Sequence, residues 1–440
     1  MTAFDRDTLI RVALTPDDTI HAPAILGDEI HRAVRATPQR RPWLEVPRLG
    51  WPLQHSPLFL ILLLAMLLVL LLGSLIVLSR LPAPARLTTY HGGPERTGVM
   101  AGPGPQGHPV IAWEAQRNGA FRVTIMPIVA KGRVFVADDS GTVGALDESD
   151  GDALWEASVG SPIRASPVWV DGLVVVGSDS GAVVALSETD GGEAWRFVAA
   201  GPVSASLAAV ERTVYVGSED THLYALDAAS GQLKWSLPVG GPITRGPAIS
   251  GGVVYVGARG GRLSAVDAAG RATLWSVELG DGDVGTPAVS EGVVYVGRGI
   301  EAPAASPHDL VALSTHDGSL LWSFVSPAGR QVHLGAVGND LIYAVSEDNS
   351  VYGLDRGTGR VVWGHETEGR VGSLAALVDG VLYVSSTDGT VRALGAATGT
   401  LHWTIAVEGE PTMPAVINGR VLVGTTRGKV HAIGGTEVVP

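Results

Sequence analysis

From residue 109 to the C-terminus, short apolar segments alternate with polar turn residues. Segments such as "LVVVG" (173–177) and "VVYVG" (253–257) are rich in β-branched residues, and Asp-Gly or Gly-Gly pairs precede them. Strands of about five residues bounded by such turns are typical of antiparallel sheets. No stretch with the 3.6-residue period of an amphipathic helix lies between them. The pattern therefore predicts an all-β domain.

The frame seen in "YALDAASGQLKW" (224–235) returns along the chain and ends each time in a tryptophan. These tryptophans are Trp155, Trp195, Trp235, Trp275, Trp322, Trp363 and Trp403. Their spacing is 40 residues, except 47 before Trp322 and 41 before Trp363. Each unit reads as four short strands. Regular four-stranded units predict a β-propeller, whereas a two-layer sandwich of similar strands gives no reason for the period.

The two ends of the repeat region set the number of blades. After Trp403 the chain provides three more strands and then ends at Pro440 without another terminal tryptophan. The segment "PVIAWEA" (109–115) supplies a strand that contains Trp113. We therefore expect an eight-bladed propeller over 109–440, with the last blade shared between the two termini so that the ring closes. Residues 79–108 are expected to form a linker and lead-in.

The recurrent motif has a structural interpretation. A glycine follows Asp150, Asp190 or Ser230 where a tight hairpin needs positive φ, and an alanine such as Ala225 stands ten residues before the tryptophan. We expect each indole to pack flat between neighbouring blades, against the small residue and the glycine turn. The structural docking residues predicted in this way are Trp113, Trp155, Trp195, Trp235, Trp275, Trp322, Trp363 and Trp403.

This motif resembles the tryptophan-docking motif of the pyrroloquinoline quinone (PQQ)-like propellers, roughly A-x-D-x-x-T-G-x-x-x-W. The resemblance covers about residues 86–440, and "HGGPERTGV" (91–99) looks like the lead-in of such domains. The family includes quinoprotein alcohol and glucose dehydrogenases, the outer-membrane assembly lipoprotein BamB and many exported propellers without an assigned activity. Because every branch carries the motif, the resemblance implies the fold and not the function.

One segment has the character of a membrane span. Residues 58–78, "LFLILLLAMLLVLLLGSLIVL", contain no charge and match the thickness of a hydrocarbon core. A cleaved signal peptide is the alternative, because Ala83-Pro84-Ala85 is a weak cleavage match. Flanking arginines barely discriminate the orientation. Since most members of the resembled family are exported, we expect a cytoplasmic tail (1–57), a single-pass transmembrane helix and an extracytoplasmic propeller.

Charge and cysteine content narrow the partners. The net charge is −13, which argues against nucleic acid and anionic lipid as main partners. The chain has no cysteine, which excludes disulfides, thiolate metal sites, cysteine nucleophiles and lipid attachment through cysteine. Aspartates recur in the turn between the second and third strands of several units. Turn stabilisation explains them better than calcium binding, because they lack an EF-hand or RTX spacing.

The fifth repeat departs from the period through the loop 297–313, which is rich in Pro and Ala. Long loops on a rigid scaffold are where propellers place binding contacts. Arginine and histidine residues near the ends of other loops fall on the same predicted face. The possible binding residues are Arg164, Arg245, Glu301, His308, Asp309, Arg330, His333 and Arg370. The alternative is a tolerated insertion beside solvated arginines.

Enzyme signatures are absent: the chain contains no GxSxG, HExxH or P-loop. The resemblance to quinoprotein dehydrogenases would imply a vicinal cysteine pair in many members and a Glu/Asn/Asp calcium cluster, and the first is impossible here. No catalytic residue, metal or cofactor is predicted. We expect a membrane-anchored scaffold that binds other envelope proteins. The alternatives are a PQQ-dependent dehydrogenase, or a ligand sensor that signals through the tail and its candidate helix at 24–36.

Overall fold

The chain divides into two compact units, residues 1–82 and residues 83–440. The computed structural model describes residue 66 and residues 87–122, 125–269, 272–300, 309–371 and 374–435. Within these residues, no helix has both the length and the apolar character to cross a membrane. Apart from Met66, the predicted tail (1–57) and transmembrane segment (58–78) lie outside the described residues.

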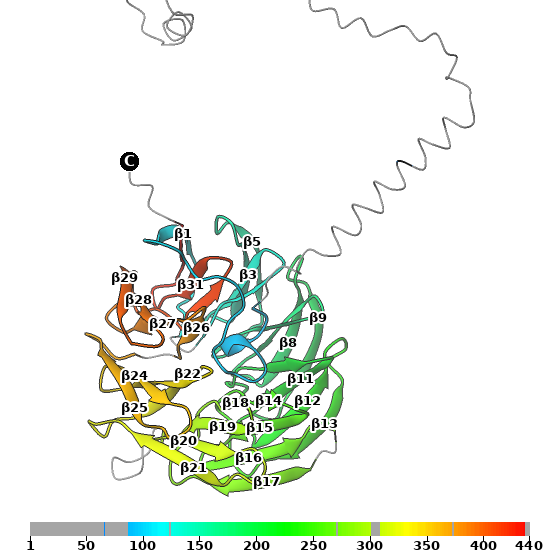
Figure 1. The fold of residues 1–440 in the computed structure, drawn as a ribbon. Helices are drawn as coiled ribbons and strands as arrows, with labels where there is room; N and C mark the ends of the chain where they lie inside the picture. The colour runs from blue at the N-terminus through cyan, green and yellow to red at the C-terminus, as the bar shows by residue number, and fades with distance from the viewer. Residues whose placement is uncertain are drawn as a thin grey trace, which may run out of the picture. The chain divides into compact units, whose positions relative to one another are not determined.

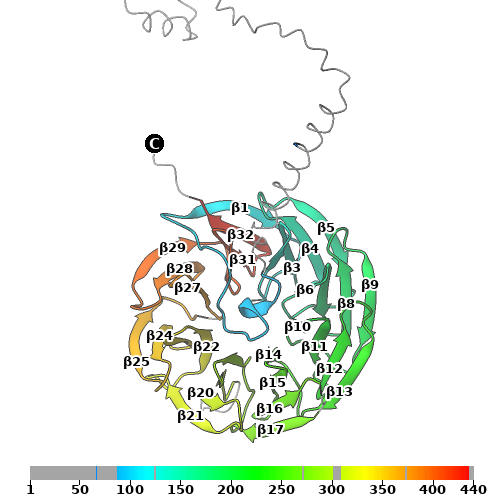
Figure 2. The same cartoon turned by 45° about the vertical axis from the view of Figure 1, so that its right-hand side comes forward.

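The second unit is a ring of eight four-stranded antiparallel sheets, as the sequence predicts (Figures 1 and 2). We call each sheet a blade. Blade 1 contains β2 (Ile128–Ala130), β3 (Arg133–Ala137), β4 (Thr142–Asp147) and β5 (Ala153–Ser158). Blade 2 contains β6 (Val168–Val170), β7 (Leu173–Gly177), β8 (Ala182–Ser187) and β9 (Glu193–Val198). Blade 3 contains β10 (Ala208–Val210), β11 (Thr213–Gly217), β12 (His222–Asp227) and β13 (Leu233–Pro238). Blade 4 contains β14 (Ala248–Ser250), β15 (Val253–Gly257), β16 (Arg262–Asp267) and β17 (Thr273–Glu278).

The other half of the ring repeats this order. Blade 5 contains β18 (Ala288–Ser290), β19 (Val293–Gly297), β20 (Asp309–Ser314) and β21 (Leu320–Val325). Blade 6 contains β22 (Val332–Val337), β23 (Leu341–Ser346), β24 (Ser350–Asp355) and β25 (Val361–Glu366). Blade 7 contains β26 (Ala376–Val378), β27 (Val381–Ser386), β28 (Thr390–Gly395) and β29 (Leu401–Ala406). Blade 8 joins β30 (Ala415–Ile417), β31 (Arg420–Gly424) and β32 (Lys429–Gly434) to β1 (Val110–Gln116).

Blade 8 closes the ring with strands from both ends of the propeller. Its strand order is β1-β32-β31-β30, and β1 pairs antiparallel with β32 from Val110↔Gly434 to Gln116↔Lys429. The prediction that the first strand completes the last blade is therefore confirmed. Because β1 and β32 pair with each other, neither strand presents that edge for pairing with another chain.

The position of a strand in its blade explains its sequence. In each blade the first strand lies nearest the centre of the ring and the fourth lies on the perimeter (Figure 2). Middle strands such as β3 are buried along nearly their whole length because blades pack face to face, so they read as continuous apolar runs. Perimeter strands such as β5 are largely exposed, with the tryptophan as the buried residue.

Two faces of the ring follow from this topology. Two-residue turns join the first and second strands; in one of them Asp171 and Gly172 have φ of 48° and 86°, as a type I′ turn requires. We call the side with these turns the turn face. The loops between blades, and those between second and third strands, lie on the other side. We call it the pocket face.

The indoles lie between blades. Nε1 of Trp155 donates to the carbonyl oxygen of Glu188 in blade 2 at 3.0 Å, and a Cβ added at Gly191 of that blade would lie 2.6 Å from Cε3 of the same indole. Ala145, the cross-strand partner of Trp155, belongs to its own blade. The indole therefore contacts an alanine in one blade and a glycine turn in the next. Donors of the same kind are Trp113, Trp195, Trp275, Trp322 and Trp363.

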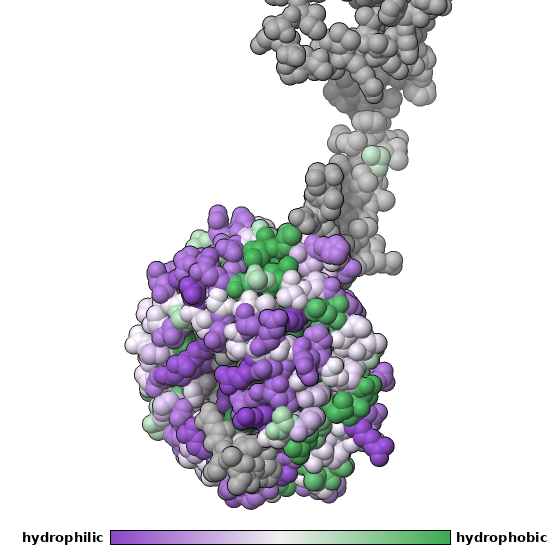
Figure 3. Space-filling view, turned by 90° about the vertical axis from the view of Figure 1, so that its left-hand side faces the viewer, coloured by the Kyte–Doolittle hydropathy of each residue, from purple (hydrophilic) through white to green (hydrophobic). Residues whose placement is uncertain are grey.

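Exposed apolar side chains gather on perimeter strands. The view in Figure 3 shows separate apolar patches among polar groups. Blades 5 and 6 carry the largest share: Leu320, Leu321 and Val325 on β21, and Val361 and Val362 on β25. Small dispersed apolar patches are common on soluble proteins. Nothing in the described residues indicates what would cover these patches.

Candidate functional site

The lead-in segment (79–108, described from residue 87) lies in the centre of the ring. Its short 3-10 helix, η2 (Tyr90–Gly92), is the central blue element in Figure 2. Carbonyl oxygens of the lead-in accept hydrogen bonds from backbone N–H groups in the innermost strands of six blades. These donors are Val129, Trp169, Ile249, Val289, Val337 and Leu377. The free edges of the inner strands are thus paired with one non-repeated segment.

Two blades use side chains of the lead-in instead. The N–H of Val416 in blade 8 lies 3.1 Å from Sδ of Met100, and Arg96 reaches Leu207 O beside blade 3. Together these contacts join the lead-in to all eight blades. The segment needs glycine to follow this path: Gly98 has φ of 74°, and a Cβ there would lie 2.6 Å from Nε2 of His91.

Arg96 places a positive charge at the centre of the ring. It is fully buried and donates to three carbonyl oxygens, those of Pro247 at 3.1 Å and of Tyr90 and Leu207 at 2.5 Å. Among the described residues, no carboxylate lies within ion-pair distance of it. Burial lowers the pKa of Arg96 to about 10, so the guanidinium stays protonated at neutral pH. Among the described residues its charge is met by carbonyl dipoles and by the face of the Tyr90 ring, and not by a carboxylate.

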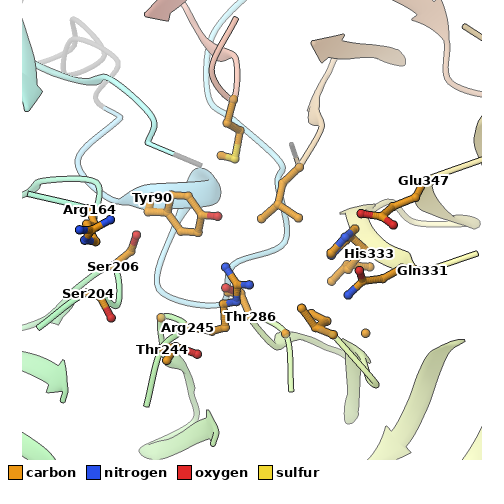
Figure 4. A pocket seen from close by; sticks show the side chains of 17 residues that line it. Tyr90, Arg164, Ser204, Ser206, Thr244, Arg245, Thr286, Gln331, His333 and Glu347 are labelled. Atoms are coloured by element: carbon orange, nitrogen blue, oxygen red, sulfur yellow. The ribbon is translucent and has the colours of Figure 1, made fainter. Parts of the chain in front are cut away.

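A pocket of about 270 Å³ adjoins the lead-in on the pocket face. Tyr90 lines it from the lead-in, and loops of blades 2 to 8 supply the remaining walls (Figure 4). We call it the central pocket. Its polar and charged side chains are Tyr90, Arg164, Ser204, Ser206, Thr244, Arg245, Thr286, Gln331, His333 and Glu347.

Hydrogen-bond donors outnumber carboxylates in the lining of the central pocket, and two of these donors are used within the protein: Ser204 donates to Glu219 at 2.6 Å and Thr244 to Asp283 at 3.2 Å. Glu347 is the one carboxylate among its described lining residues, and it accepts a hydrogen bond from Arg370 at 3.2 Å. Nε2 of Gln331 is buried and has no hydrogen-bond partner within the described part of the chain. The pKa of His333 is lowered to about 4, first by burial and then by the charges of Arg245 and Arg370, so its imidazole is neutral at pH 7.

A second, more open hollow of about 540 Å³ shares Arg164, Ser204, Thr244 and Arg245 with the central pocket. Ion pairs neutralise much of its charge. Arg164 and Asp179 are 2.6 Å apart, and Arg259 and Asp283 are 3.2 Å apart. This second hollow is therefore a surface of mixed charge that adjoins the central pocket.

The structure brings some of the predicted binding residues together and separates others. Arg164, Arg245 and His333 line the central pocket, and Arg370 reaches it through Glu347. Arg330 is exposed and does not line the pocket.

The remaining predicted binding residues, Glu301, His308 and Asp309, do not line the central pocket as far as the structure describes them. Asp309 is buried at the start of β20, where its carboxylate forms a 2.5 Å ion pair with Arg298, and it is not among the described residues that line the central pocket. Glu301 and His308 lie outside the described residues.

Sequence reasoning missed several pocket residues. Ser204 and Thr244 occupy the same place in their loops as Arg164, the residue after an apolar Ile or Val. Aligning the loops in addition to the tryptophans would have found them. Tyr90 and Gln331 carry no such signal, because Tyr90 is outside the repeats and the loop of Gln331 departs from the common pattern.

The recurrent aspartates serve their turns. Asp220 accepts hydrogen bonds from the N–H of His222 and from the Tyr224 hydroxyl, at 2.9 and 2.6 Å. Equivalent bonds to the N–H two residues later are made by Asp138, Asp348 and Asp388. These contacts support the turn interpretation of the aspartates.

The quinoprotein branch implies a calcium-bound PQQ, which needs a set of oxygen ligands for the metal ion. Within the described residues, no group of three or more histidine, aspartate or glutamate side chains is arranged to hold a metal ion. Glu347, the one described carboxylate of the central pocket, is engaged by Arg370. Hard cations such as Ca²⁺ take six or more oxygen ligands, often carboxylates. The described donor set does not fit that arrangement.

Solved structures share the fold at low sequence identity. BamB from Moraxella catarrhalis is 20% identical with a TM-score of 0.59, over 75% of this chain and 99% of that one. The computationally designed Ika8 protein is 18% identical with a TM-score of 0.65, over 73% and 98%. Quinohemoprotein alcohol dehydrogenase from Comamonas testosteroni is 14% identical with a TM-score of 0.66, over 81% and 82%. No curated protein sequence matches the chain.

A sequence-family model matches almost the whole propeller. The model is described as outer membrane protein assembly factor BamB, and it matches residues 111–244, 240–344 and 347–437. These matches begin in β1 and end after β32, so they span all eight blades. The chain therefore belongs to the BamB family of PQQ-like β-propellers.

Proposed function

We propose that the chain is a non-catalytic scaffold of the cell envelope and that a partner protein docks on its pocket face. The observation that carries this proposal is the central pocket, a donor-rich hollow whose floor comes from the lead-in and whose walls come from loops of seven blades. Loops on a rigid ring can hold recognition groups in fixed positions. The family's description as an assembly factor favours a protein partner.

The structure of the site also favours binding over chemistry. His333 is held neutral by burial and by neighbouring arginines, and Glu347 is hydrogen-bonded to Arg370. A general acid or base works best with a pKa near the operating pH, and a pKa of about 4 for His333 is far from it. The hydroxyl, amide and guanidinium groups of the pocket are suited to recognising a ligand.

Location is part of the same proposal. Residues 58–78 anchor the chain in the membrane, residues 1–57 lie in the cytoplasm, and the propeller lies outside it. Because the chain has no cysteine, single introduced cysteines can report the side. In cells freed of any outer membrane, an impermeant maleimide should label a Gln232→Cys variant at once and a Thr8→Cys variant after lysis alone. Labelling of Thr8→Cys before lysis, or of Gln232→Cys only after it, contradicts this orientation.

Docking is tested by photo-crosslinking in the native membrane. A photoreactive phenylalanine replaces Arg330 or Arg370, which are both exposed on the pocket face. The matched control replaces Arg212, which is exposed in the turn between β10 and β11 on the turn face. We expect the two pocket-face positions to capture the same protein and Arg212 to capture none of it. Equal capture from both faces, or capture from Arg212 alone, contradicts docking on the pocket face.

A further inference from the structure

Two arginine charges converge on one tyrosine at the floor of the central pocket. Arg96 lies beneath it, with Cζ 5.2 Å from the centre of the Tyr90 ring. Both Arg96 and Arg245 act on the Tyr90 hydroxyl, since the charge of each lowers its pKa against the larger raising effect of burial. Figure 4 shows Arg245 between Tyr90 and the group formed by Gln331 and His333. The floor is therefore positive although the chain carries a net charge of −13.

A buried cation without a carboxylate is costly, and a nearby anion reduces that cost. Arg96 is such a cation, fixed by three carbonyl oxygens and unable to reach solvent. In a low-dielectric centre its field is screened less than at the surface. The charge therefore favours negative groups in the pocket above Tyr90.

The hydrogen-bonding groups of the pocket have the same preference. Gln331 has a buried amide N–H group without a partner in the described residues, and the hydroxyl of Tyr90 is directed into the pocket (Figure 4). The side chain of Thr286 forms a hydrogen bond with that hydroxyl, which lowers the pKa of Tyr90 against the larger effect of burial. Together with Arg245 these groups donate, and the one carboxylate, Glu347, is engaged by Arg370. Such a set binds an acceptor with negative charge.

From these observations we infer that the central pocket is a carboxylate-binding subsite, which receives an acidic side chain or a terminal carboxylate from the docked partner. The inference rests on the proposed function, because it names the chemistry of the partner. A volume of about 270 Å³ is large enough to admit an acidic side chain or the C-terminal residue of a partner. The acidic remainder of the chain repels an acidic segment elsewhere, which directs it to this position.

His333 supplies a local readout. A carboxylate bound beside it stabilises the imidazolium, so binding should raise the pKa of His333 from about 4 toward its ordinary value. The full-length chain, labelled with ¹³C-histidine and held in detergent, is followed by NMR, and a His333→Gln variant identifies the signal. The probes are an acetylated, amidated tetraglutamate peptide, the tetraglutamine peptide of the same length, and inorganic phosphate.

We expect tetraglutamate to shift the His333 signal saturably, and its affinity should fall as the salt concentration is raised. Tetraglutamine should leave the signal unchanged. An equal shift by tetraglutamine, or no shift by tetraglutamate, overturns the inference. Phosphate that binds as tightly as tetraglutamate overturns the assignment to a polypeptide carboxylate. If the peptides overturn the carboxylate-binding subsite but crosslinking from positions 330 and 370 persists, the proposed docking function still holds. Failure of the subsite can therefore be distinguished from failure of the proposed function.

Variants locate the subsite. Arg245→Gln should weaken tetraglutamate binding about tenfold, whereas Arg212→Gln, on the turn face, should leave it unchanged. Equal weakening by both variants overturns the inference, because it indicates a diffuse charge effect. Since Arg96 variants could unfold, Tyr90→Phe is the second test; it removes one hydroxyl donor and should weaken binding about threefold with an unchanged melting temperature.

Discussion

The perimeter and the centre of this propeller hold the blades together by different means. At the perimeter, the same indole–glycine contact recurs between neighbouring blades, so each contact is local and has equivalents elsewhere in the ring. At the centre, one segment that occurs once contacts each blade through a different one of its residues. The perimeter contacts are therefore redundant, and the central contacts are not. Damage at the centre should cost more, and three predictions test this.

The largest effect is expected for Arg96→Met. The variant leaves three buried carbonyl oxygens without their donor, and each loss costs about 1–3 kcal/mol. Removing the buried charge offsets part of this. We expect a net loss of about 4 kcal/mol in the free energy of unfolding, measured by urea denaturation. Arg212→Met on the exposed turn face should change it by less than about 0.5 kcal/mol. Similar losses for both would show that the lead-in does not stabilise the ring.

The next effect is a pH dependence that originates in His91. Burial, aided by Arg96, lowers the pKa of this imidazole to about 4, while the unfolded chain has about 6.5. Between these values the unfolded state binds more protons than the folded state. The contribution of His91 to the free energy of unfolding is therefore fully present above pH 6.5 and is lost as the pH drops toward 4. The loss attributable to His91 should approach about 3 kcal/mol.

Chemical denaturation at several pH values measures this slope. His91→Gln should reduce the slope between pH 6.5 and 4, because glutamine does not titrate, while His333, whose pKa is also lowered to about 4, keeps its own contribution. His402→Gln, a substitution of an exposed histidine on β29, serves as the control and should leave the slope unchanged. A slope that is undiminished in His91→Gln assigns the acid sensitivity to other groups.

The smallest effect is expected at the perimeter. Gly191 and Gly132 both have φ of 73°, but an added Cβ lies 2.6 Å from the Trp155 indole at Gly191 and meets no atom within 4 Å at Gly132. Gly→Ala at either site should lower the free energy of unfolding by about 1 kcal/mol, because alanine is strained in the left-handed conformation. The displaced indole should add about 1 kcal/mol at Gly191 alone. Equal melting temperatures for the two variants would mean that the indole moves without loss.

The repeat made the perimeter predictable. A contact that recurs every 40 residues is visible in a single sequence, and the missing final tryptophan together with Trp113 indicated how the ring closes. The pocket was only partly accessible: arginines such as Arg164 and Arg245 stood out at loop ends, whereas Tyr90 and Gln331 did not. The ion pair of Asp309 with Arg298 was likewise not visible in the sequence, because it depends on how the two ends of the unusual loop meet in blade 5.

The sequence by itself determined the architecture, since strand length, turn residues and the tryptophan period are local properties that repeat along the chain. The tertiary structure alone decided the centre. Tyr90 and Arg96 belong to the lead-in, outside the repeats, whereas His333 lies more than 200 residues further along the chain on β22, and the chemistry of all three arises from burial and from charges that the fold brings near them. Those quantities depend on which groups surround a side chain in space, and these surroundings exist only in the closed ring with the lead-in at its centre.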